Sequence, residues 1–287
     1  MSYMIQQKQL QNKSRLGVEV LQGCNLINLT EQQRCKLKKS LWEHGVIVVK
    51  QQHLTASKLE EFARNTFGNL MFSGSNTIDP DISQDLQSQH VFAIGNPKGE
   101  TEPLEKFAWK WHQDKDGLPR TEGLDMNALY VVMLYAVEVP KEDIYGQPHT
   151  TQFIDLIEAY NNLELQQQQQ LEKISLRHKA PGFSREAIDV PTKIHPIVST
   201  HKVTGRKGLY LGIDTAIPVG MEHKPEEAKC FVQSLFQTTL ACTSIYSHVW
   251  EKGDVIFWDN SQVMHRGIAY DATKYKRIAL RLGIVEQ

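Results

Sequence analysis

The sequence has few cysteines and no strong excess of charge of either sign. Its four cysteines (Cys24, Cys35, Cys230 and Cys242) are widely spaced and form no Cys-x-x-Cys pair. This spacing argues against a disulfide framework and a cysteine-based zinc site, so we expect reduced thiols. The net charge of −1 gives no electrostatic reason to expect nucleic acid or an anionic membrane as a partner.

Long apolar runs are missing as well. No stretch approaches the roughly 18 residues of a membrane span, and the N-terminus lacks the basic start and apolar centre of a secretory signal. We therefore expect a cytoplasmic protein. The chain does have 287 residues, of which 40% are hydrophobic. That is enough for a sizeable core, and we expect one domain over residues 1–287.

The apolar pattern predicts a few helices and many short strands. Helical spacing covers Thr30–Gly45, Leu54–Gly68, Ile154–Leu176 and Pro225–Leu240. Strand-like runs include Val46–Val49, His90–Ile94, Ala128–Val139, Ile245–Trp250, Val255–Trp258, Val263–Ile268 and Arg277–Val285. This pattern indicates a mainly β fold, a barrel or sandwich with helical buttresses. The polar residues 69–105 are expected to form a lid-like or binding loop.

The tripeptide His112-Gln113-Asp114 is the first candidate site. Among the 11 histidines, only His112 is followed two residues later by an acidic residue. On a strand, positions two apart point to the same side of the sheet, so the imidazole and the carboxylate would lie close together. A second histidine would complete the two-His-one-carboxylate face of a non-haem iron site. The alternative is an ordinary histidine and aspartate on a strand.

The C-terminal region supplies further candidates. A predicted strand ends in the polar turn Asp259–Ser261, and the next strand carries His265. Beyond it, Arg277 and Arg281 fall on one face of a strand that is otherwise apolar. Two arginines facing a barrel interior are costly unless anions meet them there. The alternative is that they face solvent or pair with carboxylates.

Together, these motifs resemble the taurine/α-ketoglutarate dioxygenase (TauD/TfdA) family of Fe(II)- and 2-oxoglutarate-dependent oxygenases. The resemblance covers most of the chain, because the matching segments follow one another in the family's order. They are Leu41–Gln52, Phe62–Gly68, Trp111–Asp114, His195–Tyr210, Gly253–His265 and Arg277–Arg281. The resemblance implies a double-stranded β-helix (jelly-roll) barrel with helical buttresses.

The resemblance implies a metal site and a co-substrate site. His112, Asp114 and His265 would ligate Fe(II). Arg277 matches the family's arginine that binds the far carboxylate of 2-oxoglutarate, for which a planar guanidinium is well suited. A threonine usually shares that carboxylate. Thr151 fits this place best, with neighbouring Thr150 as the alternative.

Other positions bear on the substrate. Arg281 matches the place where the taurine-oxidising member binds its substrate's sulfonate, which implies an anionic substrate. The alternative is that this arginine only supports the co-substrate, as in other members of the family. Ala108 replaces that member's substrate-binding asparagine and argues against taurine itself. The family often has Gly-Gly-Asp-Thr where this chain has Gly146–Thr151, and His149 is either a turn residue or faces substrate. His195 and His201 are expected to be structural or to support the site from behind.

The implied activity is oxidation, most simply hydroxylation, of a C–H bond in a small organic substrate, with 2-oxoglutarate and O2 converted to succinate and CO2. Asp114 argues against halogenation, because halogenating members replace this carboxylate with a small residue. Desaturation or oxidative decarboxylation in a biosynthetic pathway is the alternative within the family. A non-catalytic small-molecule-binding barrel and a zinc hydrolase are alternatives outside it. Family members are often homo-oligomers, so a dimer or tetramer is possible.

Overall fold

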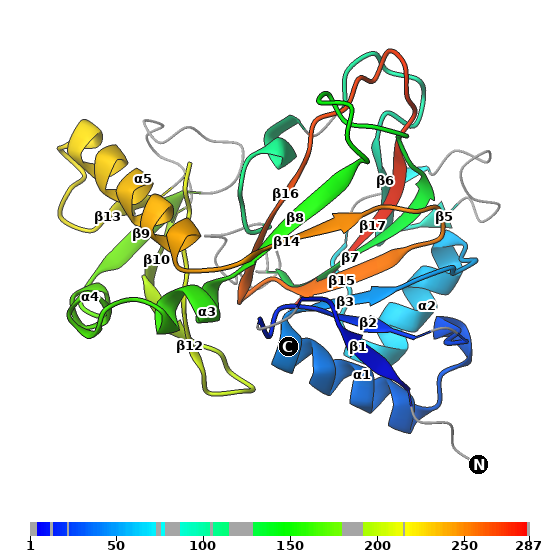
Figure 1. The fold of residues 1–287 in the computed structure, drawn as a ribbon, viewed down its shortest axis with the longest axis horizontal. Helices are drawn as coiled ribbons and strands as arrows, with labels where there is room; N and C mark the ends of the chain where they lie inside the picture. The colour runs from blue at the N-terminus through cyan, green and yellow to red at the C-terminus, as the bar shows by residue number, and fades with distance from the viewer. Residues whose placement is uncertain are drawn as a thin grey trace.

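Two β-sheets face each other and enclose the site-bearing core (Figure 1). The computed structural model describes residues 5–11, 14–21, 23–72, 76–77, 87–103, 106–114, 129–179, 192–214 and 216–285. The larger sheet has seven strands, in the order β1 (Gln7–Gln9), β2 (Val18–Val20), β3 (Val46–Val49), β15 (Val255–Asp259), β7 (Leu129–Glu138), β17 (Ile278–Val285) and β6 (Val91–Gly95). The smaller has three, in the order β14 (Ile245–Val249), β8 (Thr150–Asp155) and β16 (Val263–Gly267).

The central strands of the larger sheet are buried on both faces, which explains their unbroken apolar sequence. In β15, Val255 and Phe257 belong to the core between the sheet and its helices, whereas Ile256 and Trp258 belong to the core between the two sheets. Neighbouring strands alternate in the same way, so the sheet has two apolar faces. The predicted mainly β architecture is confirmed, with two facing sheets as the layers of a jelly roll.

Two helices cover the outer face of the larger sheet, α1 (Glu31–His44) and α2 (Ala56–Phe67) (Figure 1). Thr30 and Gln33 form a capping box at the start of α1, and Gly45 ends it with a φ of 72°. Thr55 caps α2 through Lys58 N. The short η1 (Leu26–Asn28) packs beside α2. Both predicted N-terminal helices are confirmed, and each ends where a glycine follows.

A second group of elements projects from the sandwich, on the left in Figure 1. It contains α3 (Leu156–Asn161), α4 (Leu165–Leu171), β9 (Ser175–Lys179), β10 (Thr192–Pro196), β11 (Val198–Thr200), β12 (Lys207–Leu209), β13 (Ala216–Pro218) and α5 (Pro225–Ala241). These elements share an apolar core of their own. Because Met264 of β16 and Ile154 of β8 belong to that core, it continues directly from the smaller sheet.

The single helix predicted over Ile154–Leu176 is wrong. Ile154 lies in β8 and Leu176 in β9, and the helical part is two short helices. Asp155 caps α3 by accepting from Ile157 N and Glu158 N, and Glu164 starts α4 with a second capping box. Two cap residues inside an apparently continuous pattern therefore divide it.

Several sequence expectations receive only a partial answer. Of the lid-like residues 69–105, the segments 73–75, 78–86 and 104–105 lie outside the described residues; the remainder includes β4 (Asn76–Thr77), β5 (Gln87–Ser88) and β6. All four cysteines are free thiols, as expected. Within the described ranges, the helices are too short or too polar to span a membrane. The single domain, the cytoplasmic location and the homo-oligomer stay predictions.

Candidate metal centre and active site

Two histidines from distant parts of the sequence are joined by their backbones. His112 N donates to His265 O and His265 N donates to His112 O, each at 3.0 Å, in an isolated antiparallel bridge. His265 lies in β16 opposite Phe153 of β8. The two imidazole centroids are 4.2 Å apart. The smaller sheet therefore positions His265, and the bridge places His112 directly beside it.

Asp114 reaches the histidines through a turn. The expectation that His112 and Asp114 lie on one face of a strand is wrong, because His112 forms only an isolated bridge and Asp114 already lies in the following turn. Asn260 fixes that turn: its Oδ1 accepts from Asp114 N at 3.0 Å, and its Nδ2 donates to Asp114 O at 2.8 Å. Gln113 Nε2 also donates to Asn260 O. The polar turn after β15 thus holds the backbone of Asp114.

The three side chains form one compact cluster of donor atoms. One potential ligand atom from each of the three residues lies within 4.8 Å of the other two. Asp114 Oδ1 is 3.9 Å from His112 Nε2, and Asp114 Oδ2 is 3.6 Å from His265 Nε2. His112 Nδ1 is 2.8 Å from Lys110 O. Because a carbonyl only accepts, Nδ1 donates a proton in this contact, and Nε2 is the nitrogen that faces Asp114.

The protonation states of this cluster also suit a metal. Burial alone would raise the pKa of the Asp114 carboxyl, but Arg281, His265 and His112 together hold it well below its usual range. Burial and the neighbouring His112 hold the pKa of His265 well below its usual value. Asp114 Oδ2 is buried, and no hydrogen-bond partner for it occurs in the described part of the chain. An ionised carboxylate and a neutral imidazole are the forms that bind cations.

Arg281 is a cation in direct contact with this cluster. Its Nη2 lies 3.1 Å from Asp114 Oδ1, and its guanidinium carbon lies 5.2 Å from the Phe92 ring centroid. Within β17, Leu280 and Leu282 face the helices, whereas Ala279 belongs to the core between the two sheets. Because side chains alternate along a strand, Arg281 points to the space between the two sheets, as predicted from the sequence.

Two further predicted site residues line a cavity that the metal-site cluster also lines. Thr151 of β8 is buried and lines the cavity together with Arg277, which immediately precedes β17. Trp250 Nε1 donates to Thr151 Oγ1 at 2.8 Å. Because an indole N–H can only donate, Thr151 accepts there and can direct its own hydroxyl proton elsewhere. Thr150 lies on the opposite face of β8.

These groups share one cavity of about 290 Å³ between the two sheets. His112, Asp114, His265, Thr151, Arg277 and Arg281 all line it, with the apolar side chains of Phe92, Ile94, Leu134, Trp258 and Ile268. All six predicted site residues are therefore brought together, while their individual roles stay predictions. Trp258 packs against His265 with ring centroids 4.4 Å apart, so one side of the donor cluster is shielded from water.

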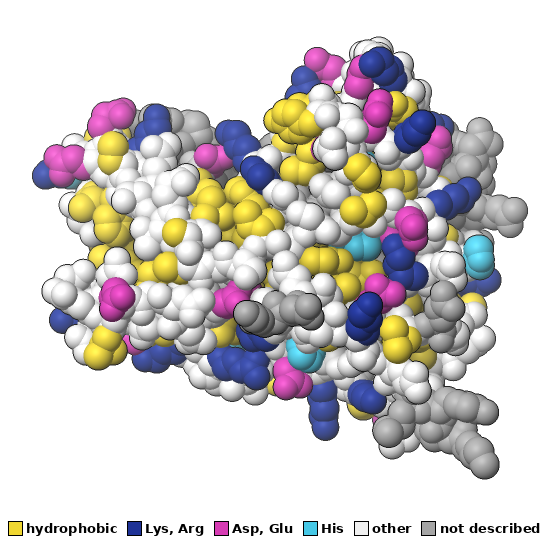
Figure 2. All heavy atoms as spheres, in the orientation of Figure 1, with side chains coloured by type: hydrophobic (Ala, Val, Ile, Leu, Met, Phe, Trp, Pro, Cys, Tyr) yellow, Lys and Arg dark blue, Asp and Glu magenta, His cyan; other side chains and the backbone are white. Residues whose placement is uncertain are grey.

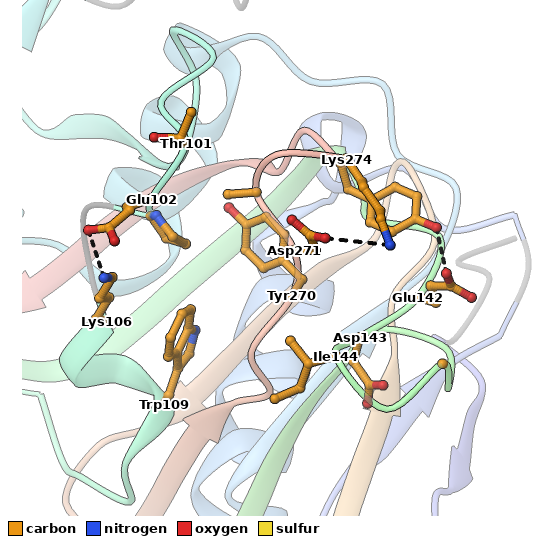
Figure 3. A pocket seen from close by; sticks show the side chains of 14 residues that line it. Thr101, Glu102, Lys106, Trp109, Glu142, Asp143, Ile144, Tyr270, Asp271 and Lys274 are labelled. Carbon is orange, nitrogen blue, oxygen red and sulfur yellow. Dashed lines mark hydrogen bonds and ion pairs between the residues drawn. The ribbon is translucent and has the colours of Figure 1, made fainter.

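A second, outer cavity of about 450 Å³ adjoins the first (Figure 3). Pro103, Trp109 and Tyr270 line both cavities. The outer cavity carries paired charges, Glu102 with Lys106 and Asp271 with Lys274. Figure 3 shows Trp109 and Tyr270 among the side chains that line the outer cavity. A polar, charged vestibule therefore lies next to a largely apolar inner cavity.

Sequence reasoning missed the residues that support the site from behind. Asn260 and Trp250 both act through hydrogen bonds to residues far away in sequence, and only the polar turn around Asn260 gave any signal. His201 Nδ1 accepts from Thr204 N, so its Nε2 carries the proton and donates to the buried Asp259 at 2.7 Å. His201 thus supports the turn that holds Asp114, in keeping with the structural role expected of it.

A jelly-roll barrel that presents two imidazoles and one carboxylate to a cavity is the arrangement of the non-haem iron oxygenases. The family model for the taurine catabolism dioxygenase TauD, TfdA family matches residues 6–282. The chain belongs to this family.

Individual relatives agree with this membership. The chain is 27% identical over 278 residues to the (S)-phenoxypropionate/α-ketoglutarate dioxygenase of Sphingobium herbicidovorans, covering 90% of this chain and 88% of that protein. It is 25% identical to the α-ketoglutarate-dependent 2,4-dichlorophenoxyacetate dioxygenase of Cupriavidus pinatubonensis, covering 91% of each. The solved structure of AAD-2 with Mn(II) and N-oxalylglycine has a TM-score of 0.75 and 22% identity, covering 99% of this chain and 98% of that one.

The chain is accordingly a 2-oxoglutarate-dependent non-haem iron dioxygenase, whose reaction uses Fe(II), 2-oxoglutarate and O2. The donor set fits the metal, because a carboxylate and two imidazoles with open positions suit Fe(II). The non-catalytic barrel and the zinc hydrolase considered from the sequence are not supported. Iron is implied by the family, and the structure supplies a matching cluster of side chains.

Replacing Asn260 with Ala is expected to lower Fe(II) affinity about 10- to 100-fold, the usual cost of removing a group that orients a metal ligand. The variant loses both hydrogen bonds that hold the backbone of Asp114. Anaerobic Fe(II) titration of the purified protein measures the effect. Asn162→Ala is the matched control, because its amide donates to Cys242 O away from the site. Equal affinities for the two variants would contradict the role of Asn260.

Proposed function

We propose that the enzyme oxidises a C–H bond of a small, anionic organic substrate, most simply by hydroxylation, while 2-oxoglutarate and O2 are converted to succinate and CO2. The observation that carries this proposal is the pair of arginines, Arg277 and Arg281, on the wall of the cavity that contains His112, Asp114 and His265. Each guanidinium can bind one anion, so the cavity can hold a co-substrate carboxylate and a substrate anion together.

The metal would be held by His112, Asp114 and His265. Bound there, Fe(II) supplies the redox chemistry that activates O2 with electrons from 2-oxoglutarate. Arg277 would bind the far carboxylate of 2-oxoglutarate and Thr151 would donate its hydroxyl proton to the same group. The indole of Trp250 supports this, because it occupies the accepting side of the Thr151 oxygen. The apolar lining, including Trp258, keeps water away from the reacting carbon.

Arg281 would bind the substrate anion. In this structure, its charge is balanced by Asp114. A divalent cation bound by Asp114 draws on the same negative charge, so Arg281 then has an unbalanced positive charge toward the cavity. Two relatives support an anionic substrate. Their names contain phenoxypropionate and 2,4-dichlorophenoxyacetate, and both compounds are carboxylates. The outer cavity, bounded on its inner side by Trp109 and Tyr270, is the proposed approach.

Succinate release with Fe(II), 2-oxoglutarate and O2 tests this proposal across panels of small carboxylates, sulfonates, sulfate esters and amino acids. Each substrate that stimulates release is then compared with its neutral ester or amide. The proposal expects the anions to be the better substrates. Product mass separates the outcomes, because hydroxylation adds one oxygen and desaturation removes two hydrogens. Equal turnover of anions and their neutral analogues would contradict the anionic class.

Replacing Arg281 with Met is expected to lower kcat/KM for the anionic substrate about tenfold or more, because a charge-assisted hydrogen bond is lost. The neutral analogue should be affected less, so the preference for the anion shrinks. Succinate release at varied substrate concentration measures both. Arg64→Met, which removes an exposed arginine paired with Glu60 on α2, is the matched control. An unchanged preference in the Arg281 variant would remove this residue from the substrate site.

A further inference from the structure

His149 is a buried histidine that the proposed chemistry leaves without a task. It immediately precedes β8 and is only 3% exposed. Its backbone carbonyl accepts from Trp250 N, and its ring meets Tyr270 edge to face with centroids 5.5 Å apart. The side chain lines the inner cavity with Thr151 and Arg277. Backbone pairing and ring packing therefore fix its position on the wall that carries the proposed co-substrate groups.

Neither ring nitrogen of His149 has a hydrogen-bond partner within the described ranges. A neutral imidazole offers one donor and one acceptor, and leaving both unpaired in a buried position is unfavourable. Burial and the nearby Arg277 lower the pKa of His149 to about 3, so the ring is neutral at ordinary pH. The ring therefore brings an unused N–H donor to the cavity wall without adding a charge.

We propose that His149 donates its ring N–H to the far carboxylate of 2-oxoglutarate, beside Arg277 and Thr151, and so helps the site select 2-oxo acids that carry this second carboxylate. This inference rests on the proposed placement of the co-substrate at Arg277 and Thr151. A carboxylate has about four lone-pair positions. It can therefore accept hydrogen bonds from a guanidinium, a hydroxyl and an imidazole at once. Because the imidazole is neutral, the single positive charge of Arg277 matches the single negative charge of this carboxylate.

The test compares two ligands that differ only at the far end. 2-Oxoglutarate carries the second carboxylate, whereas 2-oxopentanoate has a methyl group in its place. Both are titrated without O2 into the Fe(II)-loaded protein, and the weak visible absorption band of the 2-oxo acid complex gives each Kd. Because no turnover occurs, the readout is binding alone. His149→Phe keeps a flat ring against Tyr270 and removes both nitrogens, while His149→Gln restores an N–H donor.

His149→Phe should raise the Kd of 2-oxoglutarate about tenfold, the effect of losing one hydrogen bond to a charged group. The Kd of 2-oxopentanoate should stay the same, and His149→Gln should recover part of the preference. His223→Phe, at an exposed position before α5, is the matched control and should change neither Kd. Equal weakening of both ligands, or no change in either, would overturn the proposal.

Arg277→Met in the same titrations separates this inference from the proposed function. If Arg277→Met loses the preference for 2-oxoglutarate and His149→Phe keeps it, only the role of His149 is wrong. If neither variant changes the preference, the co-substrate carboxylate is bound elsewhere and both proposals are wrong. His149→Leu carries the same expectation as the phenylalanine variant should that variant fail to fold, which thermal unfolding shows directly.

Discussion

An Asp114→Asn variant is expected to release succinate at least about 100-fold more slowly than the native enzyme, and to lose most of its affinity for Fe(II). Removing a group that merely orients a ligand already costs about 10- to 100-fold. The amide has nearly the same size as the carboxylate, but it has no charge and presents a poorer donor. The variant would also leave Arg281, now without its partner at 3.1 Å, as an uncompensated positive charge beside the metal position.

Anaerobic Fe(II) titration and succinate release together measure this effect. Asp214→Asn is the matched control, since Asp214 pairs with Lys110 at the surface and its side chain is 63% exposed. The control should bind iron and turn over like the native enzyme. Retention of both properties by Asp114→Asn would mean that the metal is held by other residues.

Replacing Arg277 with Met is expected to raise the KM for 2-oxoglutarate about 100-fold. Breaking a buried, hydrogen-bonded charge pair costs roughly 2–5 kcal/mol, and each 1.4 kcal/mol is a factor of ten. The methionine keeps the apolar stem of the side chain and removes the guanidinium. Succinate release at varied 2-oxoglutarate concentration, with the organic substrate saturating, measures the change.

Arg281→Met provides the crossed comparison for this experiment. It should change the KM for the organic substrate and leave the KM for 2-oxoglutarate nearly unchanged, whereas Arg277→Met should do the reverse. The two residues lie four positions apart on one wall of one cavity, so the pair tests whether they serve different anions. If both variants affect the same ligand, the separate roles proposed for them are wrong.

Features that depend only on residues close together in the sequence could be predicted from it. Arg281 points between the two sheets because side chains alternate along β17. This alternation depends only on the neighbouring residues of the strand. Helix α1 begins after Thr30, whose side chain caps it, and ends before Gly45, which has a positive φ. Both effects act within one turn of the helix. The resemblance to the family favours Thr151 over Thr150, and alternation in β8 explains why Thr151 is the one that lines the cavity.

Contacts between distant segments could not be predicted in this way. Asp114 approaches the histidines through a turn held by Asn260, which lies in another strand connection. The Trp250 indole that orients Thr151 comes from the end of β14. The division between α3 and α4 was missed because Asp155 and Glu164 resemble ordinary exposed residues in a helical pattern, and only the structure shows that they cap new helices.

The bridge between His112 and His265 has a consequence for how the enzyme is assembled in the cell. The two histidines meet only when β16 has paired with β8, near the end of the chain. During synthesis, His112 and Asp114 leave the ribosome before His265, so the nascent chain would lack one of the three proposed metal ligands. With the proposed ligands, iron would bind only after β16 has paired with β8, and the bound metal would then stabilise this pairing by mass action.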